Sequence, residues 1–390
     1  MVGLGHVADL NPILTGLFRA HAAIPRRLFT SGRAFRPLHL AIEVTYRCNL
    51  RCNFCQYLDI IEGSAEHIGP VKEFTFEQIC RAIEQFPRGR LITFSGGETL
   101  MRKDFPDILA HACRRHRAHV ISNGALITEA IASRYVGLAP RRVWQRGLVL
   151  VGISLEGNAE VHDRIVGRPG SWQRTMLGVD ALVRARRDAR KSFPKLGMLI
   201  VVTRDTVGGL VDFVRLAADR GMDIVNFITE HSIVPHSGTL TSHPLDDRIR
   251  LPQPRPEGVD AVALRDELEA AFALAAERGL EVKTTPAGLP IREFVRHYTE
   301  DRALSADEYV CGAAWSRLAI GADGRYTPAC PYLRVGDART GDLREVWNGG
   351  ELTAFRRRIA RDRVYAGCSG CCNLQYMGPR GGELEGEPQR

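Results

Sequence analysis

The stretch LHLAIEVTYRCNLRCNFC, residues 38–55, joins a short apolar run to three closely spaced cysteines. The run 38–44 has the length and apolar character of a buried β-strand. Cys48, Cys52 and Cys55 follow it directly with the spacing CxxxCxxC. In a parallel α/β barrel, residues just past the carboxyl end of a strand lie at the active face. The stretch therefore predicts a thiol-bearing site at the end of the first strand.

Outward from this stretch, short apolar runs alternate with helical patterns, which is typical of successive βα units around a parallel sheet. Six strands are predicted, at residues 38–44, 90–94, 118–122, 148–154, 196–203 and 222–228. Helices are expected near residues 75–85, 104–117, 128–136, 171–187, 206–220 and 259–278. The predicted fold is α/β, a partial (β/α)6 TIM-like barrel, because the pattern stops before the eight units of a complete barrel.

The chain is expected to divide into five segments around this barrel. They are an N-terminal helical extension (1–37), the core barrel (38–230), a linker loop with the sixth helix (231–279), a cysteine-bearing domain (280–375) and a disordered tail (376–390). Residues 231–258 are rich in Pro, His and Ser, as long loops are. The extension has apolar residues at helical spacing, Leu14, Leu17 and Phe18, flanked by arginines. A helix docked on the main domain is favoured over a basic helix at a membrane surface.

The composition is that of a globular chain without membrane spans. Hydrophobic residues make up 44% of the 390, and no apolar run reaches the roughly 18 to 20 residues that cross a bilayer. The net charge is +8, but the 53 basic residues are almost all arginines spread along the whole chain. Without a basic tail or stripe, no nucleic-acid partner is predicted. The first residues lack the apolar core of a secretory signal, which favours the cytoplasm.

The ten cysteines are clustered: three lie within eight residues and five lie in the last 80. A disulfide scaffold would be short, secreted and bridged throughout, so these clusters indicate metal sites. Three thiolates without a fourth cysteine nearby would leave one iron of a four-iron cluster open to a small molecule. The alternatives are a buried helix face made by positions i, i+4 and i+7, and a structural zinc site, which would need four closed ligands.

The spacing CxxxCxxC, with Phe54 just before the third cysteine, resembles the radical S-adenosylmethionine (radical SAM) superfamily. The resemblance implies that the amino and carboxylate groups of SAM chelate the open iron and that Phe54 contributes to the cofactor site. The second predicted strand runs into Gly96, Gly97 and Glu98, which are similar to the glycine-rich motif that receives the SAM amino group. Glycine suits that position because the backbone can approach a ligand closely. Glu98 would add a negative charge near the ammonium.

Two further strand ends resemble the family's SAM contacts. Ser122 and Asn123 end the third predicted strand and Ser154 ends the fourth, where related enzymes contact the ribose and carboxylate of SAM. Family members often carry an arginine a little further on. Val166 occupies that place here, so Arg164 and Arg168 are the nearest candidates to bind the SAM carboxylate. Ordinary turns are the alternative interpretation of both strand ends.

The C-terminal cysteines resemble the auxiliary-cluster domain of many radical SAM enzymes, called SPASM or Twitch. The short Twitch form with one cluster fits better, because no cysteine follows Cys372. The resemblance implies four ligands, Cys311, Cys330, Cys368 and Cys371, with Cys372 as an alternative to Cys371. Zinc held by cysteine pairs is the competing interpretation. Cys80 and Cys113 fall in predicted helices and are expected in the core.

The resemblance implies a definite chemistry. A reduced cluster at the first three cysteines would cleave SAM to methionine and a 5′-deoxyadenosyl radical, which abstracts hydrogen from an unactivated carbon. The auxiliary 4Fe-4S cluster would take up a second electron. Candidate polar groups near the substrate are Tyr57 and Asp59 after the cysteines and Glu230 and His231 after the sixth strand.

The expected substrate is a small molecule, such as a sugar, an aminocyclitol or another natural-product intermediate. Only about 37 residues precede the barrel, which leaves no room there for a peptide-recognition domain. A peptide-maturing enzyme that forms thioether or carbon–carbon cross-links or epimerises residues is one alternative. A non-catalytic iron–sulfur or zinc protein is another. The resemblance also implies a flavodoxin- or ferredoxin-type reductant as a partner.

Overall fold

The computed structural model describes residues 12–55, 57–62, 72–142, 144–230, 258–300, 305, 307–328, 333–364, 368 and 371–378. Within them, the larger sheet has nine strands in the order β10-β9-β1-β2-β3-β4-β5-β6-β7. Neighbouring strands pair in parallel, except that β10 is antiparallel to β9. The strands are β1 His39–Glu43, β2 Leu91–Ser95, β3 Arg117–Ser122, β4 Gly147–Ser154, β5 Lys195–Val202, β6 Ile224–Thr229, β7 Glu281–Thr285, β9 Arg317–Ile320 and β10 Tyr326–Pro328.

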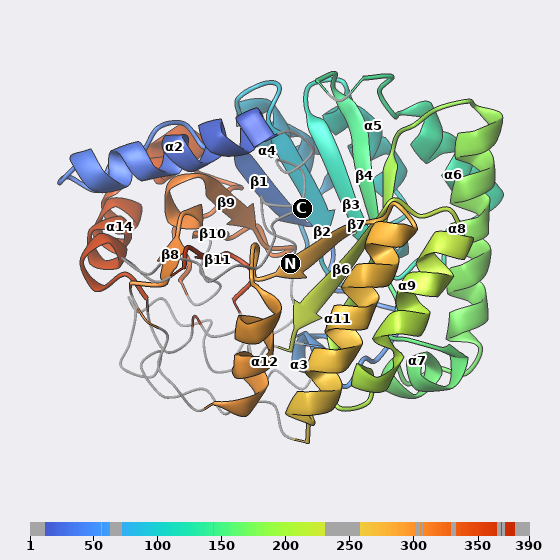
Figure 1. The fold of residues 1–390 in the computed structure, drawn as a ribbon. Coiled ribbons are helices and arrows are strands. Elements are labelled where there is room, and N and C mark those ends of the chain that lie inside the picture. The colour runs from blue at the N-terminus through green and yellow to red at the C-terminus, as the bar shows by residue number, and fades with distance from the viewer. Residues whose placement is uncertain are drawn as a thin grey trace.

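Helices follow the strands and cover the outer face of the curved sheet (Figure 1). They are α4 Phe76–Gln85, α5 Phe105–Cys113, α6 Glu129–Gly137, α7 Ala159–Ile165, α8 Ser171–Asp188, α9 Leu210–Asp219 and α11 Ala261–Glu277. Polar caps begin several of them. Thr75 and Gln78 form a capping box at α4, and Thr128 accepts a hydrogen bond from the N–H of Ile131 at α6. These side chains satisfy N–H groups that a helix start leaves without a partner.

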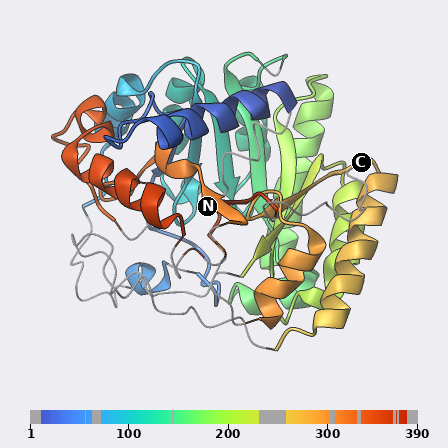
Figure 2. The same ribbon diagram turned by 60° about the vertical axis from the view of Figure 1, so that its left-hand side comes forward.

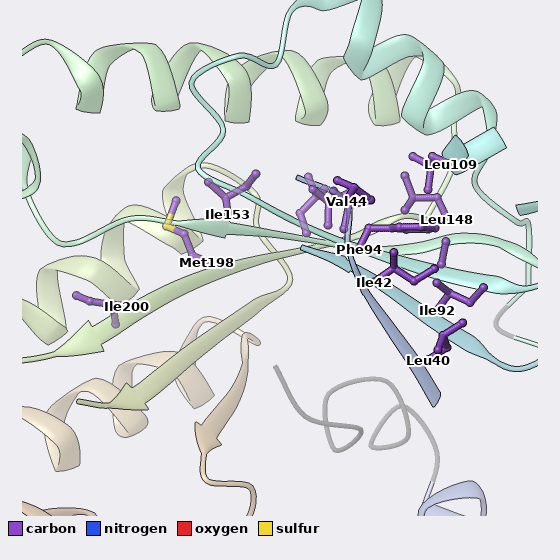
Figure 3. Close-up of a cluster of buried hydrophobic side chains, with 14 of the residues drawn as sticks. Leu40, Ile42, Val44, Ile92, Phe94, Leu109, Leu148, Ile153, Met198 and Ile200 are labelled. Atoms are coloured by element: carbon purple, nitrogen blue, oxygen red, sulfur yellow. The ribbon is translucent and has the colours of Figure 1, made fainter. Parts of the chain in front are cut away.

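The main core lies between the sheet and these helices. Successive side chains of a strand point to opposite faces, and Leu40, Ile42 and Val44 lie together with Phe94 of β2 and Leu109 of α5 (Figure 3). All of them are almost completely buried. The alternate positions of the strands face the interior of the partial barrel, where the side chains are more polar.

The N-terminal and C-terminal elements gather beside the β10 edge of the sheet. The N-terminal helix α2, Pro12–Leu28, lies beside α14, Gly350–Asp362, in both views (Figure 1, Figure 2). The same region contains the 3-10 turn η4 Ala313–Trp315, α13 Leu343–Trp347 and the small sheet of β8 Tyr309–Cys311 and β11 Leu374–Tyr376, whereas α12 Ile291–Thr299 packs on α11 near the ends of β5 and β6. A docked N-terminal helix is what the sequence predicts.

The segment around β11 connects the two edges of the parallel sheet. On one side, the buried Arg317 of β9 donates a hydrogen bond from its guanidinium to Oδ1 of Asn373. On the other side, Gln375 forms a parallel bridge with Ala287, just past β7. Residues 373–375 therefore lie across the open side of the partial barrel.

The predicted α/β class with a parallel sheet is confirmed, and the six predicted strands correspond to β1 to β6. The parallel sheet is larger than predicted, however. The segment from residue 280 on, expected as a separate cysteine-bearing domain, begins with β7, which pairs in parallel with β6. Its sequence EVKTT lacks an apolar run, so hydrophobic periodicity does not reveal it.

Several predicted features lie outside the described residues. They are most of the linker 231–258, His231, Cys330, residues 379–390 of the expected tail, and the side chain of Asp59. Among the helices that are described, none combines the length and the apolar character needed to cross a membrane.

We expect Gly178 of α8 to be essential for the packing of this helix on the sheet. A Cβ at Gly178 would lie 2.2 Å from the backbone oxygen of Gly124, just past β3. Gly178→Ala should therefore lower the free energy of unfolding by about 1 to 3 kcal/mol, the usual range for overpacking. A Cβ at Gly137 of α6 would have nothing within 4 Å, so Gly137→Ala is the matched control.

Gly137→Ala should leave stability unchanged or raise it by up to about 1 kcal/mol, because alanine favours a helix over glycine. Urea unfolding followed by circular dichroism measures both variants. Equal midpoints for the two variants would contradict the close contact between α8 and the β3 loop.

Candidate active site at the carboxyl ends of the strands

The three cysteines lie on the loop that follows β1, at the carboxyl edge of the sheet. Their thiols are free and partly buried. The N–H of Leu50 donates to Sγ of Cys48 at 3.4 Å, and the N–H of Tyr57 donates to Sγ of Cys55 at 3.5 Å. These two bonds orient lone pairs of sulfur and partly offset a negative charge on it. The loop thus presents three sulfurs that are prepared to act as ligands.

The electrostatics of these thiols fit an iron–sulfur group. Burial raises the pKa of all three, and the pKa of Cys52 is raised further by the carboxyl of Glu156 and by Cys55 and Cys48. Three thiolates in such a place repel one another and need a cationic partner. Iron supplies that positive charge, and thiolates are its usual ligands in clusters.

In the part of the chain that the structure describes, no three His, Cys, Asp or Glu side chains lie close enough to hold a single metal ion. A four-iron cluster does not require that closeness, because each cysteine binds a different iron of the cluster. Cys48, Cys52 and Cys55 therefore fit a cluster with one iron left open.

The glycine turn after β2 lies directly against the chain that leads to the cysteines. The N–H of Gly97 donates to Thr45 O, and the N–H of Glu98 donates to Arg47 O, both at 2.8 Å. A Cβ at Gly96, whose φ is +130°, would lie 2.3 Å from Thr45 O, and a Cβ at Gly97 would lie 2.3 Å from Arg47 O. Both positions require glycine, because any side chain would separate the two segments.

The carboxylate of Glu98 connects the ends of β2 and β3. It is buried and accepts hydrogen bonds from Ser122 Oγ at 2.9 Å, from the N–H of Asn123 at 2.8 Å and from the N–H of Leu100 at 3.1 Å. Burial raises its pKa while these donors lower it. The sequence predicts Glu98 beside the SAM ammonium, and the structure shows its carboxylate occupied by protein donors. It fixes Ser122 and Asn123 beside the glycine turn.

A second group of contacts fastens the cysteine loop to the end of β3 and to the segment after α7. Asn123 donates from Nδ2 to Oδ1 of Asn49 at 2.9 Å, and Arg168 donates from its guanidinium to Asn49 O at 2.9 Å. The N–H of Arg51 donates to Val166 O at 3.0 Å. Val166 occupies the place where members of the predicted family often carry an arginine, and it holds the cysteine loop through its backbone oxygen.

The two candidate arginines have different surroundings. Arg168 contacts the cysteine loop, which places it at the site. Arg164 is paired with Glu160 at 3.8 Å and with Asp205 at 3.6 Å, on the half-exposed side of α7. Of the two, Arg168 is the one that the structure brings to the cysteines.

Glu156, two residues past Ser154, is a site residue that sequence reasoning missed. Its side chain is 4% exposed, and Oε2 accepts a hydrogen bond from the N–H of Val201 at 3.0 Å. Its own N–H donates to Nδ1 of His162 at 3.1 Å. Burial raises the pKa of Glu156 to about 8, and the carboxyl is the largest charged influence on Cys52. The signal in the sequence that could have identified Glu156 is its position, a carboxylate just past the end of a predicted strand.

The other predicted polar groups lie around this centre. Tyr57 is buried behind the loop, where its hydroxyl donates to the carboxylate of Glu43 at the end of β1 and its ring lies 5.7 Å from that of Tyr46. Burial raises the pKa of Glu230, whose N–H donates to the hydroxyl of Tyr298 at 2.8 Å. Phe54 is partly buried on the cysteine loop. Tyr57 thus joins the cysteine loop to the end of β1.

The C-terminal cysteines form a second thiol group. Cys311 ends β8 and pairs in register with Leu374 of β11, which follows Cys371 and Cys372 closely. The thiol of Cys371 is hydrogen-bonded to that of Cys372, and this bond, burial and the neighbouring Cys368 and Cys311 raise its pKa well above the usual range. The structure thus brings Cys311, Cys368 and Cys371 together, with Cys372 beside them. Cys330 lies outside the described residues.

Family comparisons agree with these two thiol sites. Residues 42–217 match the model of the radical SAM superfamily, and residues 311–372 match that of the SPASM iron–sulfur cluster-binding domain. Both expectations from the sequence are confirmed. The cofactors are accordingly SAM with the iron–sulfur cluster of the first domain, and the auxiliary cluster of the second.

Curated relatives are similar over parts of the chain. Fe-coproporphyrin III synthase of Methanosarcina barkeri is 28% identical over 47% of this chain and 41% of its own length. The subtilosin biosynthesis protein AlbA of Bacillus subtilis is 33% identical over 37% and 30%. A probable GTP 3',8-cyclase of Methanosarcina acetivorans is 26% identical over 84% and 86%. The chain spans about a third to a half of the length of the first curated relatives it matches.

A solved structure supports the fold. SuiB of Streptococcus suis bound to S-adenosylmethionine superposes with a TM-score of 0.59 at 16% identity, over 89% of this chain and 72% of that one.

We expect Glu156 to make stability depend on pH. The folded protein keeps a proton on Glu156 up to about pH 8, whereas the unfolded chain releases it near the ordinary pKa of 4.5. Between these values the wild type should lose stability as pH rises, by at most about 1.4 kcal/mol per pH unit. Glu156→Gln removes this loss, so its stability relative to wild type should increase from pH 5.5 to pH 8.

Urea unfolding of the metal-free protein at several pH values measures the effect, because iron would add its own charge. Glu160 of α7 provides the control, since its side chain is 89% exposed. Glu160→Gln should follow wild type at every pH. A constant difference between Glu156→Gln and wild type across the range would show that the carboxyl of Glu156 is ionised in the folded protein.

Proposed function

Because residues 42–217 match the radical SAM superfamily and residues 311–372 match a SPASM iron–sulfur domain, we propose that this chain oxidises a small molecule at an unactivated carbon. The observation that carries the proposal is the pair of thiol groups on one continuous fold, one at the carboxyl edge of the sheet and one across its open side. The first initiates the reaction and the second receives an electron from it.

In this proposal, Cys48, Cys52 and Cys55 hold the cluster that binds SAM. When bound, that cluster and SAM together supply a 5′-deoxyadenosyl radical, which takes a hydrogen atom from the substrate. The protein fixes the position of the cysteine loop through the glycine turn and through Arg168. Such fixation matters because a reacting carbon must be held within about 3 to 3.5 Å of its partner.

The SAM contacts are assigned to groups that line the same edge. The backbone at Gly96 and Gly97 approaches the ligand, Ser154 at the end of β4 faces the barrel interior, and Phe54 lies beside the third cysteine. Glu156 and Glu230 are the carboxyls at the ends of β4 and β6. Burial raises the pKa of Glu156 to about 8, which suits it to exchange a proton near neutral pH, and burial also raises the pKa of Glu230.

The auxiliary site is assigned four ligands, Cys311, Cys330, Cys368 and Cys371. Four protein ligands leave no iron open, so this site exchanges electrons and does not bind substrate. The substrate loses one hydrogen atom at the first site, then one electron at the second and one proton to a nearby base. The net result is a two-electron oxidation.

A small-molecule substrate is supported by the extent of one similarity. The relative named a probable GTP 3',8-cyclase matches over 84% of this chain and 86% of its own length. Heme synthases match as well, over about half of this chain. The names of these relatives refer to small molecules, namely heme and GTP.

Peptide maturation is the second candidate. It is favoured by the 33% identity to the subtilosin biosynthesis protein and the 30% identity to mycofactocin maturase MftC of Mycolicibacterium smegmatis. Both matches cover less than half of the relative's length. The small molecule therefore remains our primary proposal.

The electron that starts the reaction comes from a flavodoxin- or ferredoxin-type protein. We place the reaction in the cytoplasm, because a reducing compartment preserves reduced thiols such as those of Cys48, Cys52 and Cys55.

Iron counting tests the two sites separately. The protein reconstituted without oxygen should hold about eight irons, four for each cluster. Cys52→Ala should lose about four irons and all dithionite-driven cleavage of SAM. Cys371→Ala should also lose about four irons but keep SAM cleavage, because only the auxiliary site is affected. About four irons in the wild type would contradict a second cluster.

Isotope transfer tests the substrate class. Extracts of cells grown in heavy water are divided into a small-metabolite fraction and a peptide fraction, and each is given to the reduced enzyme with SAM. The abstracted deuterium should appear in 5′-deoxyadenosine with the small-metabolite fraction, as mass spectrometry detects. Label obtained with the peptide fraction instead would establish the peptide-maturing alternative.

A further inference from the structure

The end of α2 and the loop after it form a strongly basic surface. The sequence has no acidic residue between Asp9 and Glu43, and five arginines fall in that interval. Of these, Arg27, Arg33 and Arg36 are exposed. The neighbouring α14 adds the exposed Arg357, whose side chain lies next to Gly32.

Large apolar side chains are exposed among these arginines. Leu28 is 71% exposed, Phe35 38% and Phe29 37%. The rings of Phe29 and Phe35 contact each other edge to face with centroids 5.4 Å apart, so the two form one patch. Exposed apolar groups that gather in this way, surrounded by charge, usually mark an interaction site. We call Arg27, Leu28, Phe29, Arg33 and Phe35 the arginine–aromatic surface.

This surface lies beside the auxiliary thiol site. The inner side of α2 packs on the segment after β8, where Cβ of Ala22 is 3.6 Å from the Cβ position of Gly312, the residue next to Cys311. One turn further along α2, Arg26 lies near enough to Cys311 for its charge to act on the thiol, although burial is the larger influence and raises the pKa of that thiol overall. The arginine–aromatic surface begins at the next position, Arg27. Figure 2 shows α2 crossing this part of the molecule next to α14.

We propose that the arginine–aromatic surface is the docking site of an acidic one-electron carrier protein that exchanges electrons with the auxiliary site. The inference rests on the proposed function, in which that site receives an electron from the substrate. The carrier gains one electron, the auxiliary site loses one, and no covalent bond forms or breaks. The carrier is of the flavin- or iron–sulfur-containing class.

Position favours a carrier over other anionic partners. Electron transfer becomes steeply slower with distance, so a carrier must dock where a cluster ligand lies close beneath the surface. Charge complementarity would guide its approach, since positive patches speed encounters with acidic proteins. The apolar side chains would then exclude water from the contact. Binding to an anionic lipid surface would require the arginines and the apolar groups, but it would not require them to lie beside Cys311.

Binding of purified flavodoxin to the reconstituted protein tests the proposal. The double variant Arg27→Glu with Arg33→Glu should weaken binding at low ionic strength by about tenfold or more, since it replaces attraction by like-charge repulsion. Wild-type binding should weaken as salt is added. The control is Arg141→Glu with Arg142→Glu, which changes the same charge at two exposed arginines before β4 and should bind as wild type does.

The pair Arg27→Gln with Arg33→Gln should give an intermediate loss, which distinguishes charge from misfolding. Dithionite-driven SAM cleavage should be unchanged in all these variants, because dithionite needs no docking site. Absence of cleavage in the wild type would refute the proposed function and leave the binding result standing.

Equal flavodoxin binding by the Arg27/Arg33 and Arg141/Arg142 variants would overturn the docking proposal. So would binding of phosphatidylglycerol vesicles by the wild type that the Arg27/Arg33 variant loses, because the surface would then serve a membrane.

Discussion

The contact between two backbone segments, 45–47 and 96–98, determines the position of the whole candidate site. The first segment leads from β1 to the cysteines, and the second is the glycine turn after β2. Two N–H···O bonds of 2.8 Å join them, in a space that no Cβ could enter. The buried carboxylate of Glu98 then fixes the end of β3 against the glycine turn, because it accepts hydrogen bonds from Ser122 and Asn123. Asn123 in turn donates a hydrogen bond to Asn49, which lies on the cysteine loop.

This arrangement explains why the glycine turn and the cysteines depend on each other although some 40 residues separate them in the chain. The sheet brings the ends of β1 and β2 together through parallel pairing. Helix α8 supports the same region from outside, where Thr175 donates to Asn123 O and Gly178 permits close approach to Gly124. The loops that hold a cofactor are thereby built on rigid elements rather than on their own contacts.

The sequence was sufficient for six strands, the thiol groups and the glycine turn, because each has a local signature: an apolar run, a cysteine spacing or a pair of glycines. It was insufficient where tertiary contacts decide. Strand β7 has a polar sequence and exists because β6 offers it a partner. Arg168 could be named as a candidate, but only the fold shows that its guanidinium binds the backbone of Asn49. Glu98 is hydrogen-bonded within the protein, which no spacing reveals.

Glu156 shows most clearly why burial must be known before chemistry can be assigned. In sequence it is an ordinary carboxylate in a turn after β4. In the fold it lies near the thiol of Cys52, with Val201 N–H as a donor and little access to water. Ionising every group there would concentrate negative charge in a poorly solvated place, which is costly. Burial raises the pKa of Glu156 to about 8, so its carboxyl would stay mostly protonated near neutral pH and would leave the negative charge beside a bound cluster to the cysteines. The distribution of protons at this edge of the sheet is therefore a property of the fold as a whole.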